Sequence, residues 1–337
     1  MNDGLVAAFR PDLRVRLEGS AFALRHFAAE YRRALVSAGI DDLAVAIAFV
    51  EDVGPAHGVV FRGRYKTVAW MVDVSADDER SIRARVAIRG RPRSFALSLV
   101  QGYYVEPLIS IASAAGGTVL LPGSGICLEG GATLLLGRSR SGKSTLSAVA
   151  LASDRPILGD DQILLDGSGT AYPFPRRLRF YSDLPLTSPE AYARLPSFDR
   201  AALKARRLTV VVTRGFVAPP IRVPAAAIGP EPAGGGASVS RVVVIERAGT
   251  TDELSISRPT VDEVVGLATA ILDEQRSHLA GGAAGRWLAR LDRTRERETE
   301  ILSEALQGRQ LERFLVPTSW DAPRAASELG RRLGIAR

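Results

Sequence analysis

The sequence has few of the residues that build disulfides and metal cages. Cys127 is its single cysteine among 337 residues, which excludes an internal disulfide and a cysteine-based zinc site. No apolar stretch is expected to reach the length of a membrane span, and the charged residues near the N-terminus do not fit a secretory signal. We therefore expect a cytoplasmic protein without a membrane partner.

Lysine is also scarce. It occurs only at Lys66, Lys143 and Lys204, so arginine supplies nearly all of the positive charge behind a net charge of +7. The arginines are spread along the chain beside abundant alanine and glycine, which indicates a compositional bias rather than a binding surface. The sequence has no recognition helix, zinc finger or RNA-binding motif, so nucleic acid is not an expected partner.

What is present is the composition of a globular protein, with 46% hydrophobic and 24% charged residues. A length of 337 residues allows one large or two ordinary domains. The hydrophobic pattern predicts an N-terminal α+β domain over residues 1–116 and a second domain over residues 117–337. In the first domain, strands are predicted at 13–18, 43–50, 59–65, 67–74 and 84–88, and helices at 20–36 and 94–114.

The second domain has the succession of short apolar strands and helices that is typical of an α/β fold. Strands are predicted at 118–121, 126–128, 132–136, 208–212 and 240–246, and helices at 144–152 and 261–274. From about residue 260 the chain is expected to form a helical extension, with helices over 286–307 and from 323, and a short strand at 314–317.

One segment carries a recognisable chemical pattern. Residues 137–144 read Gly-Arg-Ser-Arg-Ser-Gly-Lys-Ser and match the P-loop pattern G-x-x-x-x-G-K-[ST] at every fixed position. Gly137 and Gly142 allow the backbone to turn tightly, so that its N–H groups point at phosphate oxygens. The helix that follows adds the positive end of its dipole. A predicted strand before the loop and a helix after it provide the required context, and a Gly/Ser-rich surface turn is the alternative.

The side chains of this loop have separate roles on a nucleotide triphosphate. Lys143 reaches the β- and γ-phosphates, and the Ser144 hydroxyl ligates Mg²⁺. The chain has only three lysines, and one of them stands at this position, which supports the identification of a P-loop. The predicted nucleotide-binding residues are Gly137, Arg138, Ser139, Arg140, Ser141, Gly142, Lys143, Ser144 and Thr145.

Two adjacent carboxylates, Asp160 and Asp161, follow an apolar strand after the loop helix. Carboxylates in such places help to hold Mg²⁺ in phosphoryl-transfer sites. Because side chains alternate along an extended segment, both cannot point at one ion unless the backbone turns. We predict that one serves the metal and that the other is the general base for the incoming nucleophile. A polar turn between two strands is the alternative.

A P-loop followed at this spacing by an apolar-Gly-Asp-Asp segment resembles the bacterial HPr serine kinase/phosphorylase family and the wider group of related kinases. The resemblance covers residues 117–180, including Pro173-Phe-Pro175, and implies a nucleotide fold akin to that of phosphoenolpyruvate carboxykinase. It implies ATP as co-substrate, Mg²⁺ as cofactor and contact between Lys143 and the transferring phosphate. It also implies that Asp161 accepts the proton of a substrate hydroxyl, while Asp160 supports the metal.

The chain departs from that family at several points. The bifunctional enzymes carry a histidine where this chain has Pro122, so the reverse, phosphorylase reaction is not expected. The family's downstream metal-binding glutamate has no match, and Asp183 and Glu190 are candidates to replace it. Residues 1–115 do not resemble the N-terminal domain of the bifunctional enzymes. Candidates for stabilising transition-state charge are Arg176, Arg177, Arg179, Arg206 and Arg207.

The leading hypothesis is a Mg-ATP-dependent kinase that phosphorylates a hydroxyl, in the first place a serine of a peptide or small protein. Diverged members of the related group act on ribosomally made peptides such as lasso-peptide precursors, so a peptide-tailoring kinase fits. A small-molecule hydroxyl is an alternative acceptor, and a nucleotide-binding regulatory or assembly protein without phosphotransfer is the alternative of another class. An open pocket beside the two carboxylates favours a kinase, and a closed wall favours the regulatory protein. Kinases of the HPr type assemble as oligomers, so a homo-oligomer stays open.

Overall fold

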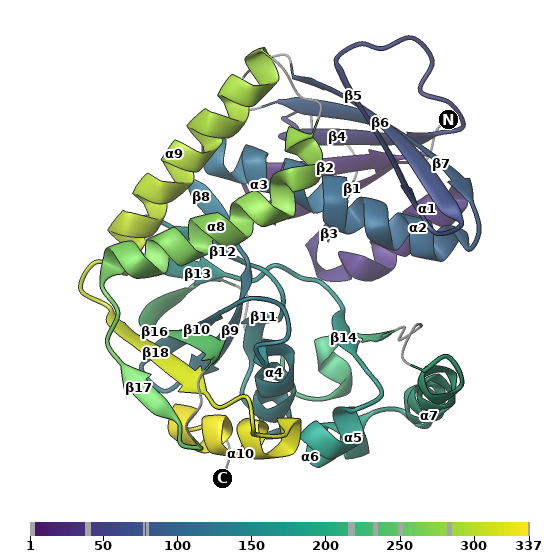
Figure 1. Ribbon diagram of the computed structural model, residues 1–337. Helices are drawn as coiled ribbons and strands as arrows, with labels where there is room; N and C mark the ends of the chain where they lie inside the picture. Colours follow the sequence, from purple (N-terminus) through teal and green to yellow (C-terminus); the bar gives the residue numbers. More distant parts are fainter. Residues whose placement is uncertain are drawn as a thin grey trace. The chain divides into compact units, whose positions relative to one another are not determined.

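The computed structural model describes residues 4–37, 42–76, 78, 81–214, 220–231, 235–248, 252–281 and 285–335. These residues have a mixed α/β fold with mixed sheets, divided between two compact units (Figure 1). The first unit comprises residues 1–120 and 269–305, and the second comprises residues 121–268 and 306–337. The predicted domain boundary at residue 116 is close to residue 120, where the chain first passes from the first unit to the second. However, residues 269–305, predicted as part of the second domain, group with the N-terminal residues.

The first unit contains most of the elements predicted for the N-terminal region. Its strands are β1 (Gly4–Arg10), β2 (Leu13–Glu18), β3 (Leu35–Val36), β4 (Val45–Val50), β5 (Val59–Tyr65), β6 (Val68–Ala76) and β7 (Ile82–Gly90). Its helices are α1 (Ala21–Glu30), the 3-10 turn η1 (Arg32–Ala34), α2 (Arg93–Val100), the π turn η2 (Gln101–Val105), α3 (Glu106–Ala115), the C-terminal part of α8 (Val261–Ala280) and α9 (Arg286–Leu306). Strand β8 (Thr118–Leu121) lies at the crossing between the units.

The sheet of the first unit has the strand order β3-β1-β2-β4-β7-β6-β5. Strands β2, β4 and β7 run parallel, and the pairs β1–β2, β5–β6 and β6–β7 are antiparallel. Side chains alternate along β7, so Ile82 and Ala84 are buried while Arg83 between them is exposed. Helices α1, α2 and α3 pack against this sheet with their apolar residues.

The segment Arg93–Ala115, which contains α2, η2 and α3, is long and apolar enough to cross a membrane by length and composition. The expectation that no stretch reaches this length is therefore wrong. It is the one such helix in the described part of the chain, and 72% of its most apolar window is buried inside the protein. Burial of this kind is what a core helix of a soluble protein shows, and it explains the length of the apolar run.

A buried ion pair and an aromatic contact connect the late helices to the first unit. The Glu298 carboxylate of α9 accepts two hydrogen bonds from Arg276 of α8 at 2.6 Å and one from the Ser110 hydroxyl of α3 at 3.2 Å. The ring of Trp287 lies 6.4 Å from that of Phe61, measured between centroids. These contacts are the physical reason why residues 269–305 group with the N-terminal part of the chain.

The second unit contains the predicted loop and its flanking elements. Its strands are β9 (Gly123–Leu128), β10 (Gly131–Leu136), β11 (Ile157–Gly159), β12 (Ile163–Asp166), β13 (Thr170–Tyr172), β14 (Leu178–Phe180), β15 (Ile221–Val223), β16 (Ala237–Arg247), β17 (Ser255–Ser257) and β18 (Gln310–Val316). Its helices are α4 (Lys143–Ala152), α5 (Leu184–Thr187), α6 (Pro189–Arg194), α7 (Ser197–Val212), the 3-10 turn η3 (Ala225–Ala227), α10 (Ala322–Leu333) and the N-terminal part of α8.

The strands of the second unit bring several strand ends to one edge of its sheet. Strand β16 runs parallel to β10 on one side and to β18 on the other. Strand β9 lies antiparallel to β10, and β11 lies antiparallel to β9. Strand β11 therefore runs in the same direction as β10, and both end at the same edge. In sheets with parallel strands, such an edge is where ligands bind.

The strand predicted over residues 208–212 is wrong. These residues form the C-terminal end of α7, which begins at Ser197. The β-branched run Val210 to Val212 favours a strand locally. The preceding Ala201 to Arg207 is rich in strong helix formers, and a helix that has already nucleated propagates at little cost into the residues that follow.

Candidate functional site

The glycine-rich loop lies between β10 and α4, in the predicted strand–loop–helix arrangement. Gly137 has a φ of +155° and Gly142 a φ of +105°, and residues with a side chain rarely adopt either conformation. A Cβ atom at Gly137 would lie 2.4 Å from the carbonyl oxygen of Ile245 in β16. Gly142 is the N-cap of α4, so the positive end of the helix opens onto the loop.

Lys143, the first residue of α4, folds back over the loop. Its Nζ donates hydrogen bonds to the carbonyl oxygens of Gly137 at 2.6 Å and Arg138 at 3.1 Å, and to the Ser141 hydroxyl at 3.3 Å. Burial lowers the pKa of Lys143, and the negative charges of the two nearby aspartates oppose that shift. The acceptors of this ammonium group are neutral oxygens. Hydrogen bonds to an anion are stronger, so an anion can replace these oxygens as the partner of Lys143.

The two carboxylates lie directly after β11, next to the loop. The Asp161 carbonyl oxygen accepts a hydrogen bond from the N–H of Gly123 at 3.0 Å. Gly123 in turn pairs with Leu136, the last residue of β10 before the loop. Backbone pairing therefore brings residues 160–161 to the loop, although a whole helix separates them in sequence.

Asp160 is buried in this arrangement, with 7% of its surface exposed. Neither of its carboxylate oxygens has a hydrogen-bond partner among the described residues. Burial raises the pKa of Asp160 to about 7, and the charge of Asp161 adds to that shift. The hydroxyls of Ser147 and Ser144 oppose it, yet neither is placed with the geometry of a hydrogen bond to these oxygens. Burying a charged carboxylate without partners costs free energy unless a cation pairs with it. The Asp160 carboxylate is therefore suited to binding a cation.

Asp161 has a different environment. Its side chain is 39% exposed, and its Oδ2 lies 3.7 Å from Nη1 of Arg176. Burial raises the pKa of Tyr181, and the negative charge of Asp161 contributes to that shift. The adjacent aspartates are thus divided between a sealed environment and an open one, and both lie in a bend between β11 and β12.

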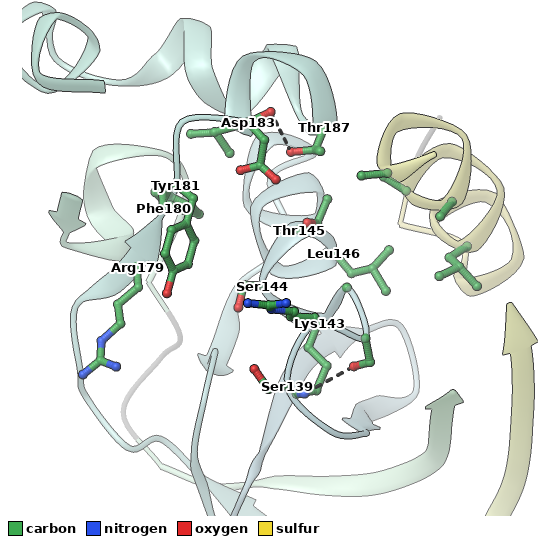
Figure 2. A pocket seen from close by; sticks show the side chains of 18 of the residues that line it. Ser139, Lys143, Ser144, Thr145, Leu146, Arg179, Phe180, Tyr181, Asp183 and Thr187 are labelled. Atoms are coloured by element: carbon green, nitrogen blue, oxygen red, sulfur yellow. Dashed lines mark hydrogen bonds between the residues drawn. The ribbon is translucent and has the colours of Figure 1, made fainter. Parts of the chain in front are cut away.

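A cavity of about 820 Å³ connects the loop with Asp161 (Figure 2). Its walls come from Ser139 to Thr145, Asp161, the β14–α5 segment and α10. Asp160 does not line it and lies buried behind. Cavities of ~300–1,000 Å³ are typical of small-molecule sites. The space beside Asp161 is therefore open, which is the arrangement that the sequence analysis associated with a second substrate.

The cavity has a polar side and an apolar side. Arg179 and Tyr181 line the polar side with Asp161, and Asp183 lines the cavity next to Thr187. Figure 2 shows Arg179 and Tyr181 on one side of α4, whereas Leu146 points to the other side, toward α10. The apolar side is lined by Leu146, Ala322, Ala325, Ala326 and Leu329.

The structure separates the residues that the sequence analysis considered. Asp183 lines the cavity, as does Arg179, and Arg176 pairs with Asp161. The candidates that do not line the cavity are Glu190, Arg176, Arg177, Arg206 and Arg207. Of the predicted loop residues, Gly137 and Arg138 do not line it either.

The sequence predicted the helix that is α10, but it did not indicate that this helix or Arg247 lines the site. Arg247 is the last residue of β16, lines the cavity and donates a hydrogen bond to the Trp320 carbonyl oxygen at 3.0 Å. A signal was available, because Arg247 directly follows a predicted strand and ligands bind at the carboxyl ends of parallel strands. Helix α10 carries no comparable local signal, since its contribution depends on how the C-terminus packs.

Comparison with protein-family models gives no match, and comparison with curated proteins gives no relative.

Proposed function

We propose that the protein is a Mg-ATP-dependent kinase, with a P-loop domain of the HPr-kinase type, that transfers the γ-phosphoryl group to a hydroxyl. The observation that carries this proposal is the cavity shared by the loop and Asp161. A protein that only senses a nucleotide needs no room beside the acidic residue. A kinase needs that room, because both substrates must be held in contact for transfer.

The donor phosphates occupy the loop in this proposal. Lys143 exchanges its contacts with loop carbonyl groups for phosphate oxygens, because charge-assisted hydrogen bonds are the stronger ones. Arg140 lines the same cavity and adds positive charge. Catalysis then consists mainly of positioning and of stabilising charge on the transferring group.

Ser144 and Asp160 are the residues that would hold Mg²⁺. The two partnerless, buried oxygens of Asp160 are the observation that fits a cation. The described residues contain no group of three or more His, Cys, Asp or Glu side chains that could hold a metal. Mg²⁺ does not require one, since it commonly binds through one or two carboxylates together with phosphates and water. When bound, the ion neutralises negative charge on the phosphates.

Asp161 is the proposed general base on the acceptor side. Its carboxylate opens into the cavity beside Arg179, Tyr181 and Asp183, which are the polar groups available to an acceptor. Pro122 precedes Gly123, whose N–H bonds to Asp161, and the proline side chain cannot exchange a proton. We therefore expect phosphorylation rather than the reverse reaction. The proposed acceptor is a peptide or protein serine, and a small-molecule hydroxyl is the alternative acceptor.

One observation favours a second candidate function, a nucleotide-binding regulatory protein without phosphotransfer. Asp161, the proposed base, forms an ion pair with Arg176, with 3.7 Å between Oδ2 and Nη1. A carboxylate that is paired with a guanidinium group is less available to an acceptor hydroxyl. Nucleotide binding would then serve only to set a conformation.

Transfer from γ-labelled ATP to a panel of serine peptides and small alcohols tests the proposal. Asp161→Asn is expected to keep ATP binding and to lose about 10²–10⁴-fold in transfer, the usual contribution of a general base. Glu190→Gln removes an exposed carboxylate of α6 that does not line the cavity, and it is expected to behave like the wild type. Transfer by Asp161→Asn at the wild-type rate refutes the base assignment. ATP binding by the wild type without transfer to any member of the panel supports the second candidate.

A further inference from the structure

Helix α7 (Figure 1) presents an apolar stripe at the surface of the second unit. The side chains of Phe198, Leu208 and Val212 are 81%, 65% and 74% exposed. Ala201 and Ala205, both exposed, lie between them, so that the five residues recur at alternate spacings of three and four. This spacing places all five side chains along one face of a helix.

The stripe is not the face by which α7 is anchored. Leu203 is the buried residue of this helix and belongs to the hydrophobic core of the second unit. With 3.6 residues per turn, Leu203 lies on the side of the helix opposite the stripe. Large apolar side chains that lie next to one another at a surface mark an interaction site. The exposed face of α7 therefore needs a partner.

The form of the stripe favours a second helix as that partner. Alternate spacings of three and four residues are the a and d pattern of a coiled-coil seam. A helix that lies on a membrane instead carries a broad face of large apolar side chains. The middle of this stripe consists of Ala201 and Ala205, and small side chains at a helix contact allow the two axes to approach closely.

The charge of α7 indicates which kind of helix fits. Asp199 is its single acidic residue, and its basic residues are Arg200, Lys204, Arg206 and Arg207. A second copy of α7 would bring the same positive charge to the contact, and the juxtaposition of like charges disfavours such a pair. A partner with acidic residues beside its own seam is attracted, because flanking charges set the choice of partner in coiled coils.

We propose that the stripe on α7 is a docking surface for an acidic amphipathic helix of another protein or peptide. The two helices form a short coiled coil of about two heptads, in which Phe198, Leu208 and Val212 pack between side chains of the partner. The residues of α7 do not line the cavity at the glycine-rich loop. The docking surface is therefore independent of the proposed phosphotransfer.

Binding of two synthetic peptides, measured by fluorescence anisotropy, tests this proposal. The first is a fluorescein-labelled peptide of about three heptads with leucine at a and d and glutamate at e and g. The second has the same apolar seam with lysine at e and g. Leu208→Glu places a charge in the stripe at an exposed position. Leu288→Glu makes the same change at an exposed leucine of α9, in the first unit, and is the matched control.

The acidic peptide is expected to bind the wild type and Leu288→Glu saturably, with a dissociation constant below about 100 µM. Leu208→Glu is expected to weaken this binding by about tenfold or more, and raising the ionic strength is expected to weaken it as well. The absence of saturable binding, equal binding of the two peptides, or unchanged binding by Leu208→Glu overturns the proposal.

Two further measurements identify a different occupant and would also overturn it. The first is analytical ultracentrifugation, in which a wild type that dimerises while Leu208→Glu stays monomeric assigns the stripe to a second copy of the chain. The second is sedimentation with anionic phosphatidylglycerol vesicles. Binding to these vesicles without binding of the acidic peptide assigns the stripe to a membrane surface.

Discussion

The backbone N–H of Gly123 donates a hydrogen bond to the carbonyl oxygen of Asp161 at 3.0 Å. Gly123 also pairs with Leu136, the residue that precedes the glycine-rich loop. One short strand thus connects the acidic residues after β11 with the loop after β10. The position of Asp161 is set by backbone pairing, so replacing its side chain is expected to alter chemistry more than structure.

Lys143→Ala is expected to weaken nucleotide binding. A hydrogen bond to a charged group contributes about 1.5–3 kcal/mol, so the dissociation constant for ATP should rise about ten- to hundredfold. Equilibrium dialysis or calorimetry measures this change. Lys204→Ala, which removes an exposed lysine of α7, is the control. ATP binding that is the same in Lys143→Ala and the wild type would contradict the proposed role of the loop.

Gly137→Ala is expected to destabilise the loop and to reduce nucleotide affinity. The new Cβ would lie 2.4 Å from the Ile245 carbonyl oxygen and 2.8 Å from the Ser141 hydroxyl, and backbone strain of this kind costs about 1–3 kcal/mol. Gly266→Ala on α8 is the matched control, since its Cβ would meet nothing within 4 Å. That control should gain about 0.5–1 kcal/mol in the helix. Thermal unfolding with and without ATP distinguishes the two, and an unaffected Gly137→Ala protein would be inconsistent with this backbone.

Glu298→Ala is expected to lower the free energy of unfolding by about 3 kcal/mol, because it leaves the buried Arg276 guanidinium without its main partner. Burial raises the pKa of Glu298 even though Arg276 opposes that shift. Glu300→Ala is the control, since its pair with Arg297 is exposed and such pairs contribute ~1 kcal/mol or less. Urea denaturation measures both variants. Equal effects of the two substitutions would show that the buried pair does not stabilise the first unit.

Asp73 gives the first unit a stability that depends on pH. Burial alone would raise the pKa of Asp73, but hydrogen bonds from Arg85 and from the N–H groups of His57 and Gly58 outweigh burial and hold the pKa below its ordinary value. Because the folded-state pKa is the lower one, the stabilisation is complete above the unfolded pKa of about 3.9 and is lost as pH falls through the folded value.

Asp73→Asn should therefore be less stable than the wild type at neutral pH, and the difference should shrink below about pH 4. Denaturation at a series of pH values measures this difference. Asp52→Asn, at an exposed position whose closest approach to Arg89 is 3.9 Å, should show little effect. A deficit in Asp73→Asn that stays constant down to the acid range would rule out this linkage.

Local sequence was sufficient for much of the second unit. The strand before the loop, both positive-φ glycines and the helix that starts at Lys143 are adjacent in the chain, so their spacing predicted their geometry. The prediction failed at residues 208–212, where β-branched residues favour a strand but continue a helix that begins with strong helix formers. The helices α8 and α9 were predicted, but not the grouping of residues 269–305 with the N-terminal residues, because the buried contacts of Glu298 join residues that are distant in sequence.

The sequence by itself determined the glycine-rich loop and the pair Asp160–Asp161, since each depends on neighbouring residues and on backbone conformation. Only the tertiary structure decided that Asp160 is sealed while Asp161 opens into the cavity, because burial depends on the elements packed around them. It also decided that Arg247 and the alanines of α10 share that cavity with the loop. A cavity wall is assembled from segments distant in the chain, and their packing has no signature in any one of them.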